Sequence, residues 1–209
     1  MAYRINNQLT FIHIPKNAGT SITEWIKKYT TWKYDKEAHL PIERIKQEWL
    51  DQTFCVVRNP YHRAVSLYTY WIQILKKKQS VPYLKHRIAR QLKILDEGFD
   101  SFVCNYYDYY FSKSTQIKYP QMSCLKSNSQ TAWIGTNYRG IILKYETLKQ
   151  DFEKIQDLTG CYSPLPWLNQ TKHLYKPKWK KMYTDRSIEK INQIWRMDFE
   201  CLGYEYWKD

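Results

Sequence analysis

Short hydrophobic runs alternate along the chain with longer segments in which apolar and polar residues recur at helical spacing. β-Branched and aromatic residues dominate the short runs, which is typical of buried strands. Apolar residues three and four positions apart in the longer segments predict amphipathic helices. The predicted strands are LTFIHI at 9–14, TFCVVR at 53–58 and GIILKY at 140–145.

A helix is predicted directly after each of these strands. The order strand, turn, helix therefore repeats, which predicts an α/β fold with a parallel sheet. Another helix is predicted over residues 185–204, where an Asp opens the pattern and a Gly lies near its end. The helices that follow the strands are TSITEWIKKY at 20–29, HRAVSLYTYWIQILKK at 62–77 and ETLKQDFEKIQDL at 146–158.

Two longer segments have a less regular pattern. Residues 70–130 are interpreted as a mostly helical insertion that could carry substrate contacts, and residues 160–183 as an irregular late loop that contains prolines. A length of 209 residues fits one domain with a sizeable core. We therefore expect a single domain over residues 1–209.

The charge of the chain points to anionic ligands. Lys and Arg total 33 against 20 Asp and Glu, a formal net charge of +13. Such a surplus attracts phosphates, sulfates, acidic glycans or nucleic acid. No apolar run reaches the roughly 20 residues of a membrane span, and the N-terminus lacks the pattern of a signal peptide. We therefore expect a cytoplasmic protein without a membrane span.

The turn after the first predicted strand, PKNAGTS at 15–21, has the composition of an anion cradle. It lies where a helix N-terminus offers backbone N–H groups and the positive end of its dipole. Gly19 would let the backbone approach an anion closely. Thr20 and Ser21 can donate hydroxyl hydrogen bonds, and Lys16 adds a mobile charge. These residues together predict a phosphate site.

A simpler interpretation of the same turn remains open. Lys16 would then be a surface residue, Thr20 or Ser21 would cap the helix, and Glu24 in its first turn would favour the dipole. The turn is not a Walker A motif, because Lys16 precedes Gly19 instead of following a second glycine. A magnesium-dependent NTPase is therefore disfavoured.

The second predicted strand ends in a similar way. Arg58 stands at the strand end, Asn59 and Pro60 make a turn, and Ser66 lies on the following helix. An Arg at a strand end with a downstream Ser suits a second phosphate, because guanidinium binds phosphate in a bidentate manner. Two such sites on neighbouring strands predict a ligand with two separated phosphates.

The chain resembles a known family at these residues. It is similar to sulfotransferases that use 3'-phosphoadenosine 5'-phosphosulfate, most of all to the carbohydrate group that includes heparan 2-O- and chondroitin sulfotransferases. Residues 70 to 120 show no specific likeness. The segments that carry the resemblance are IPKNAGTSI at 14–22, VVRNPYHRAVSLY at 56–68, WIGTNYRGIILKYETLKQDF at 133–152 and LPWLNQTK at 165–172.

The resemblance implies a P-loop-like three-layer fold, with helices on both sides of a central parallel sheet. It also implies in-line transfer of a sulfuryl group to an acceptor hydroxyl, which leaves 3',5'-adenosine bisphosphate. Lys16 would stabilise charge on the bridging oxygen. Arg58 and Ser66 would hold the 3'-phosphate. The residues implied at the 5'-phosphosulfate are Lys16, Asn17, Ala18, Gly19, Thr20 and Ser21.

The resemblance further implies a histidine base, and His39 in KEAHLPIERIK is the chosen candidate. A purely structural role for His39, before a helix that starts near Pro41, is also open. The other histidines are His13, His62, His86 and His173. The late loop is a further candidate contact with cofactor or substrate, through Asn169, Thr171 and Lys172.

The acceptor is interpreted as a glycan, acidic or neutral, while a small alcohol, a tyrosine residue or a lipid headgroup would also fit. No metal is expected, because the five cysteines form no C-x-x-C pair and no ligand cluster has suitable spacing. The alternative function is a non-catalytic binder of polyanions or nucleic acid, based on the net charge and on aromatic residues among lysines at 173–183. A phosphotransferase is disfavoured. The start of the chain close to the first strand favours a bacterial or viral origin.

Overall fold

The computed structural model describes residues 2–34, 41–78, 96–106, 129–168 and 179–207. These residues belong to two compact units, each made of two stretches of the chain. The first unit comprises Met1–Asn59 and Gln130–Lys172, and the second comprises Pro60–Ser129 and His173–Asp209. The expectation of a single domain stays a prediction.

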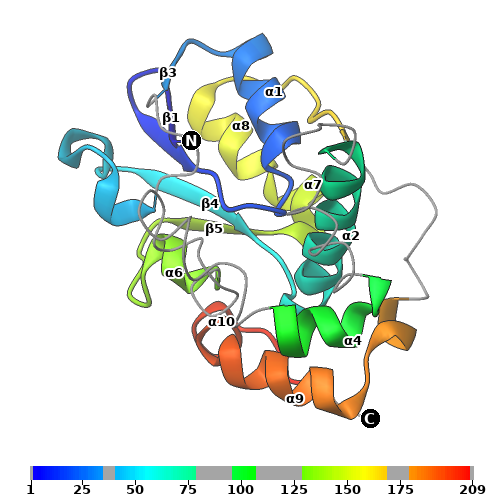
Figure 1. The fold of residues 1–209 in the computed structure, drawn as a ribbon. Coiled ribbons are helices and arrows are strands. Elements are labelled where there is room, and N and C mark those ends of the chain that lie inside the picture. The colour runs from blue at the N-terminus through cyan, green and yellow to red at the C-terminus, as the bar shows by residue number, and fades with distance from the viewer. Residues whose placement is uncertain (1, 35–40, 79–95, 107–128, 169–178, 208–209) are drawn as a thin grey trace. The chain divides into compact units, whose positions relative to one another are not determined.

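A five-stranded sheet forms the centre of the first unit, in the order β3-β1-β2-β4-β5 (Figure 1). The strands β2, β4 and β5 run parallel, as the sequence predicts. β1 pairs antiparallel with both β2 and β3, so the sheet is mixed. The strands are β1 (Ala2–Ile5), β2 (Leu9–Ile12), β3 (Trp32–Tyr34), β4 (Thr53–Val57) and β5 (Ile141–Lys144).

The hairpin between β1 and β2 was missed by the sequence analysis, although its turn has a clear signal. Asn6 and Asn7 both have positive φ, 48° and 57°. Asn tolerates this region better than most residues and is common in hairpin turns with two such positions. The N–H of Gln8 donates to the carbonyl of Ile5 at 2.9 Å and closes the turn.

Helices cover one face of this sheet, with α1 and α8 lying over the same side in Figure 1. Their apolar residues share a core with residues from the strands, and Trp25 of α1 meets Phe152 edge to face at 4.9 Å. The helix predicted at 146–158 is divided at Phe152. The helical segments are α1 (Gly19–Tyr29), η1 (Ile42–Arg44), η2 (Gln47–Trp49), α6 (Thr131–Ile134), η7 (Tyr145–Thr147), α7 (Leu148–Asp151) and α8 (Glu153–Thr159).

The described part of the second unit is helical and has its own aromatic core. Trp195 and Phe199 are buried in it, and the guanidinium of Arg63 lies 5.2 Å from the Trp195 ring centre. Trp195 also divides the helix predicted at 185–204. The segments are α2 (Pro60–Lys78), α4 (Phe99–Ser101), the π-helix η4 (Phe102–Tyr106), η8 (Trp179–Met182), α9 (Asp185–Ile194) and α10 (Arg196–Leu202).

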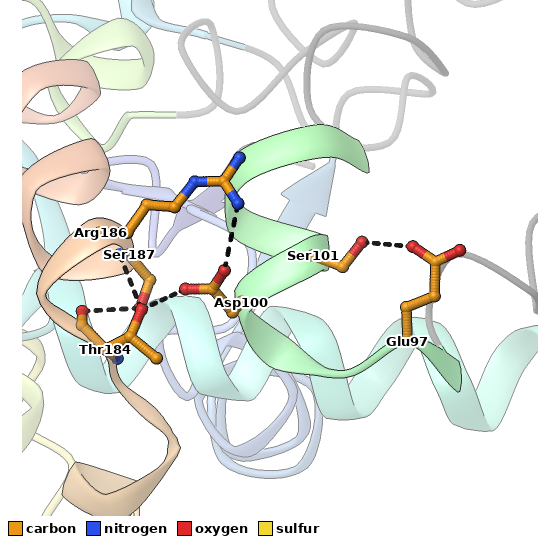
Figure 2. Close-up of polar contacts among 6 residues, drawn as sticks. All are labelled: Glu97, Asp100, Ser101, Thr184, Arg186 and Ser187. Atoms are coloured by element: carbon orange, nitrogen blue, oxygen red, sulfur yellow. Dashed lines mark hydrogen bonds and ion pairs between the residues drawn. The ribbon is translucent and has the colours of Figure 1, made fainter.

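The start of α9 is fixed by a polar network, drawn in Figure 2. The Thr184 hydroxyl accepts the N–H of Ser187 at 3.3 Å, and the Ser187 hydroxyl accepts the N–H of Thr184 at 2.9 Å. This capping box satisfies two N–H groups at the start of the helix. Asp100 of α4 accepts the Thr184 hydroxyl and lies 3.7 Å from Arg186, so the network joins α4 to α9.

The irregular segments are only partly described. Within the predicted insertion at 70–130, residues 70–78 and 99–106 are helical, while 79–95 and 107–128 lie outside the described residues. Within the late loop at 160–183, residues 161–168 form neither helix nor strand, and 169–178 lie outside.

Replacing Phe152 by Ala tests the core beneath α1. Phe152 is 2% exposed, so the loss of its ring should lower the free energy of unfolding by about 3–5 kcal/mol. Leu158→Ala on α8 is the control, because Leu158 is 40% exposed and should change that free energy by less than about 1 kcal/mol. Urea denaturation measures both. Equal effects of the two substitutions would contradict this description of the core.

Candidate functional site

The turn between β2 and α1 holds two non-glycine residues in the left-handed region. Lys16 has φ 71°, and Ala18 has φ 59° and ψ 13°. Side chains disfavour this region by about 1–2 kcal/mol per residue, and such conformations gather at ligand sites. Ala18 is followed by Gly19, the first residue of α1. Turns of this kind before a helix are suited to binding an anion through backbone N–H groups.

Among the described residues, the N-cap of α1 provides no side-chain hydrogen bond to the helix. Its N-cap is Ala18, and its first turn contains no acidic residue. The interpretation in which Thr20 or Ser21 caps this helix is therefore wrong, and Glu24 lies beyond the first turn. The first N–H groups of the helix and the positive end of its dipole remain directed toward the turn. This arrangement strengthens the case for an anion site.

Gly19 gives room to a histidine side chain. A Cβ atom built on Gly19 would lie 1.8 Å from Nε2 of His13. The imidazole of His13 also stacks on Phe11, with ring centres 5.7 Å apart. The glycine thus leaves space for packing from the strand side, a reason that differs from the close approach of an anion expected from the sequence.

The two hydroxyl residues of the turn lie in different environments. Thr20 is exposed, whereas Ser21 is buried. The Ser21 hydroxyl oxygen accepts the backbone N–H of Leu168 at 3.0 Å. Trp25, on the next turn of α1, donates its indole N–H to the carbonyl of Ser163 at 2.7 Å. These two bonds hold the described part of the late loop against α1.

Arg58 follows β4 and reaches toward the same turn. Its side chain donates from Nη1 to the carbonyl of Lys16 at 3.2 Å, and its guanidinium lies 4.0 Å from the ring centre of Tyr145. The residue is 8% exposed. The next N–H, that of Asn59, donates to Oε1 of Glu146 at 2.8 Å. Arg58 is therefore oriented by contacts with the turn and with the end of β5.

Asn17 turns its side chain inward. It is 1% exposed, and its Nδ2 donates to the carbonyl of Val56 at 2.8 Å and to Oε1 of Gln130 at 2.7 Å. Gln130 in turn exchanges two hydrogen bonds with the backbone of Arg58. In this arrangement the side chain of Asn17 anchors the turn to β4, and only its backbone remains suited to an anion.

Asp151 stabilises the turn that follows β5. Its Oδ2 accepts the N–H of Lys144 at 3.0 Å and the hydroxyl of Thr147 at 2.9 Å. Burial alone would raise the pKa of Asp151, but these hydrogen bonds outweigh it and hold the pKa below its usual value. The turn places Tyr145 and Glu146 beside Arg58 and Asn59.

Gln130, Tyr145 and Glu146 contact this site but were not predicted from the sequence. Gln130 comes from an irregular stretch and lies 72 positions from Arg58, so no local spacing could have shown their contact. Tyr145 and Glu146 do carry a signal, because they follow directly after a strand that runs parallel to β4. The carboxyl ends of parallel strands meet at one edge of a sheet.

The remaining predicted residues are not brought into this site by the described structure. Ser66 lies half-buried on α2 in the second unit, and its pairing with Arg58 stays a prediction. His62, also on α2, stacks on Trp179 with ring centres 5.5 Å apart. The candidates outside the described residues are His39, His86, His173, Asn169, Thr171 and Lys172.

Among the described residues, no group of three or more His, Cys, Asp or Glu side chains is placed to hold a metal ion. None of the helices in this part of the chain is both long and apolar enough to cross a membrane.

Comparison with known families identifies the class of protein. A model of the sulfotransferase family matches residues 3–205, nearly the whole chain and both units. The chain therefore belongs to the sulfotransferase family, which depends on 3'-phosphoadenosine 5'-phosphosulfate and includes carbohydrate sulfotransferases. The α/β fold with a helix-flanked sheet agrees with this family. No curated protein and no solved structure matches the chain.

The contact between Gly19 and His13 can be tested by a double-mutant cycle. Gly19→Ala should lower the free energy of unfolding by about 1–3 kcal/mol, because the new methyl group overlaps the imidazole. His13→Ala removes the obstacle, so the two substitutions together should cost at least about 1 kcal/mol less than their sum. Urea denaturation of the four proteins measures this coupling. Stabilisation by Gly19→Ala alone, as in an ordinary helix, would contradict the packing described.

Proposed function

We propose that this protein transfers a sulfuryl group from 3'-phosphoadenosine 5'-phosphosulfate to a hydroxyl group of a carbohydrate. The observation that carries the proposal is the turn between β2 and α1. Its backbone holds two non-glycine residues at positive φ, and the N-cap of the helix behind it is Ala18, whose side chain cannot accept a hydrogen bond. A phosphate group satisfies such N–H groups and favours the positive end of the helix dipole.

The donor would be held at both of its phosphates. Backbone N–H groups of residues 17–20, with the hydroxyls of Thr20 and Ser21, would hold the 5'-phosphate. Arg58 would hold the 3'-phosphate together with Ser66, because a guanidinium can form two parallel hydrogen bonds to phosphate. The hydrogen bond from Arg58 to the Lys16 carbonyl supports this assignment, since it joins the two binding segments.

The donor supplies an activated sulfuryl group when bound. During transfer the bond between sulfur and the bridging oxygen breaks, a bond from the acceptor oxygen to sulfur forms, and the hydroxyl proton is removed. Lys16 would donate to the bridging oxygen as negative charge develops there. His39 would accept the proton, since the ordinary pKa of histidine, about 6.5, suits a base near neutral pH. The second product is 3',5'-adenosine bisphosphate.

A carbohydrate acceptor is the interpretation favoured by two properties of the chain. The family to which it belongs includes carbohydrate sulfotransferases. The net charge of +13 would attract acidic glycans and increase their rate of encounter. Both properties are compatible with a neutral glycan as well, so the acceptor screen should contain both kinds.

Binding of 3',5'-adenosine bisphosphate tests the donor site. Calorimetry should show much tighter binding of the bisphosphate than of AMP or ATP. Lys16→Ala and Arg58→Lys should each weaken bisphosphate binding by roughly 10- to 100-fold, because each removes charge-assisted hydrogen bonds. Lys28→Ala is the matched control, because it removes the same charge at the opposite end of α1.

The same titration can overturn the proposal. Binding without preference for the bisphosphate over AMP would contradict the proposed donor site. If the affinity for the bisphosphate then fell steeply with salt and did not change in Lys16→Ala, general binding of polyanions would explain the protein better.

The role of His39 is tested separately by turnover. Transfer of labelled sulfate to a desulfated glycosaminoglycan should fall by about 10²- to 10⁴-fold in His39→Ala, the range of a lost general base. Affinity for 3',5'-adenosine bisphosphate should stay within about twofold, because a base for the acceptor proton makes no essential contact with the product nucleotide. His86→Ala is the control histidine. Normal turnover in His39→Ala would exclude His39 as the base.

A further inference from the structure

The side chain of Gln130 lies between the two segments assigned to phosphate binding. It is 0% exposed, and three hydrogen bonds of its amide connect it to those segments. Its Oε1 accepts the N–H of Arg58 at 2.8 Å and the Nδ2 of Asn17 at 2.7 Å. Its Nε2 donates to the carbonyl of Arg58 at 2.8 Å.

The orientation of both side-chain amides follows from the backbone groups that they meet. The N–H of Arg58 must face an acceptor, and its carbonyl must face a donor, which fixes Oε1 and Nε2 of Gln130. Oε1 of Gln130 then requires a donor, which is Nδ2 of Asn17. This Nδ2 also donates to the carbonyl of Val56. A reversed amide at either residue would bring two acceptors together.

Gln130 continues the pairing of β4 beyond the end of the sheet. The last parallel pair of β4 with β5 is Val57 with Lys144. Arg58 is the next residue, and Gln130 exchanges both an N–H and a carbonyl hydrogen bond with it. Directly opposed residues of two antiparallel strands exchange bonds in the same way. The side chain therefore fixes the backbone of Arg58 where strand pairing has stopped.

The same side chain also fixes the turn that precedes α1. Asn17 lies between Lys16 and Ala18, the two residues with positive φ, and is anchored to Gln130 and β4. A change in the position of Gln130 would thus move the backbone of Arg58 relative to that of the turn.

We propose that Gln130 is a positioning residue that sets the separation between the 5'-phosphate turn and Arg58, and thereby the selectivity for a nucleotide with two phosphates. The proposal rests on the proposed function, because it assigns one phosphate to each segment. A ligand that bridges two sites gains affinity only when their separation matches its own. A less fixed separation should therefore weaken the binding of a bisphosphate more than the binding of a monophosphate.

Gln130→Met tests the proposal, because methionine has a similar length but cannot form these hydrogen bonds. The affinities for 3',5'-adenosine bisphosphate and for AMP are measured by calorimetry. The readout is the ratio of the bisphosphate affinity to the AMP affinity. The ratio should fall by about tenfold or more in Gln130→Met. Gln156→Met is the matched control. It removes a partly buried hydrogen bond, at 2.9 Å, from the Gln156 side-chain amide to the carbonyl of Ser163 in the same unit. Its ratio should be unchanged.

Asn17→Leu provides a second variant should Gln130→Met fail to fold. It removes the link from the turn to Gln130 while Gln130 keeps its bonds to Arg58, and it should also lower the ratio. An unchanged ratio in a folded variant, with both nucleotides weakened equally or not at all, would overturn the role of Gln130. If the unsubstituted protein showed no preference for the bisphosphate, the proposed function itself would fail, and the positioning role with it.

Discussion

The site depends on a backbone constraint in the turn between β2 and α1. Lys16 and Ala18 must both adopt positive φ although neither is glycine. This conformation costs about 1–2 kcal/mol per residue, so the surrounding structure must hold it. The buried amide of Asn17, bonded to the carbonyl of Val56, provides one such support. Gly19, directly after Ala18, leaves space for the imidazole of His13.

The parallel strands bring the other residues of the site to this turn. Because β2, β4 and β5 are parallel, the residues after these strands meet at one edge of the sheet. Arg58 can therefore reach the carbonyl of Lys16, and Gln130 can bind the backbone of one segment and the side chain of the other. Enzymes of this family transfer a group between bound partners, and fixed positions of donor and acceptor supply much of such catalysis. A rigid arrangement of these segments suits that chemistry.

The parallel strands and the helices after them could be predicted, because β-branched runs and helical spacing are local signals. The divisions at Phe152 and Trp195 were not predicted, and both rings are buried in cores assembled from distant residues, which local spacing does not show. Lys16, Gly19, Ser21 and Arg58 were predicted as donor contacts from the turns and helices that follow two strands. The structure joins Arg58 to Lys16 by a hydrogen bond, and the roles of the four residues stay predictions. Gln130 lay beyond prediction, since its partner Arg58 is 72 positions away. His39 lies outside the described residues, so its assignment rests on the resemblance.

A crystal structure of the protein with 3',5'-adenosine bisphosphate would locate both phosphates. The 5'-phosphate should accept hydrogen bonds from the N–H groups of Gly19 and Thr20 at about 3 Å. The 3'-phosphate should contact the guanidinium of Arg58. A bisphosphate bound away from the turn, or bound with its 5'-phosphate on Arg58, would contradict the proposed donor site.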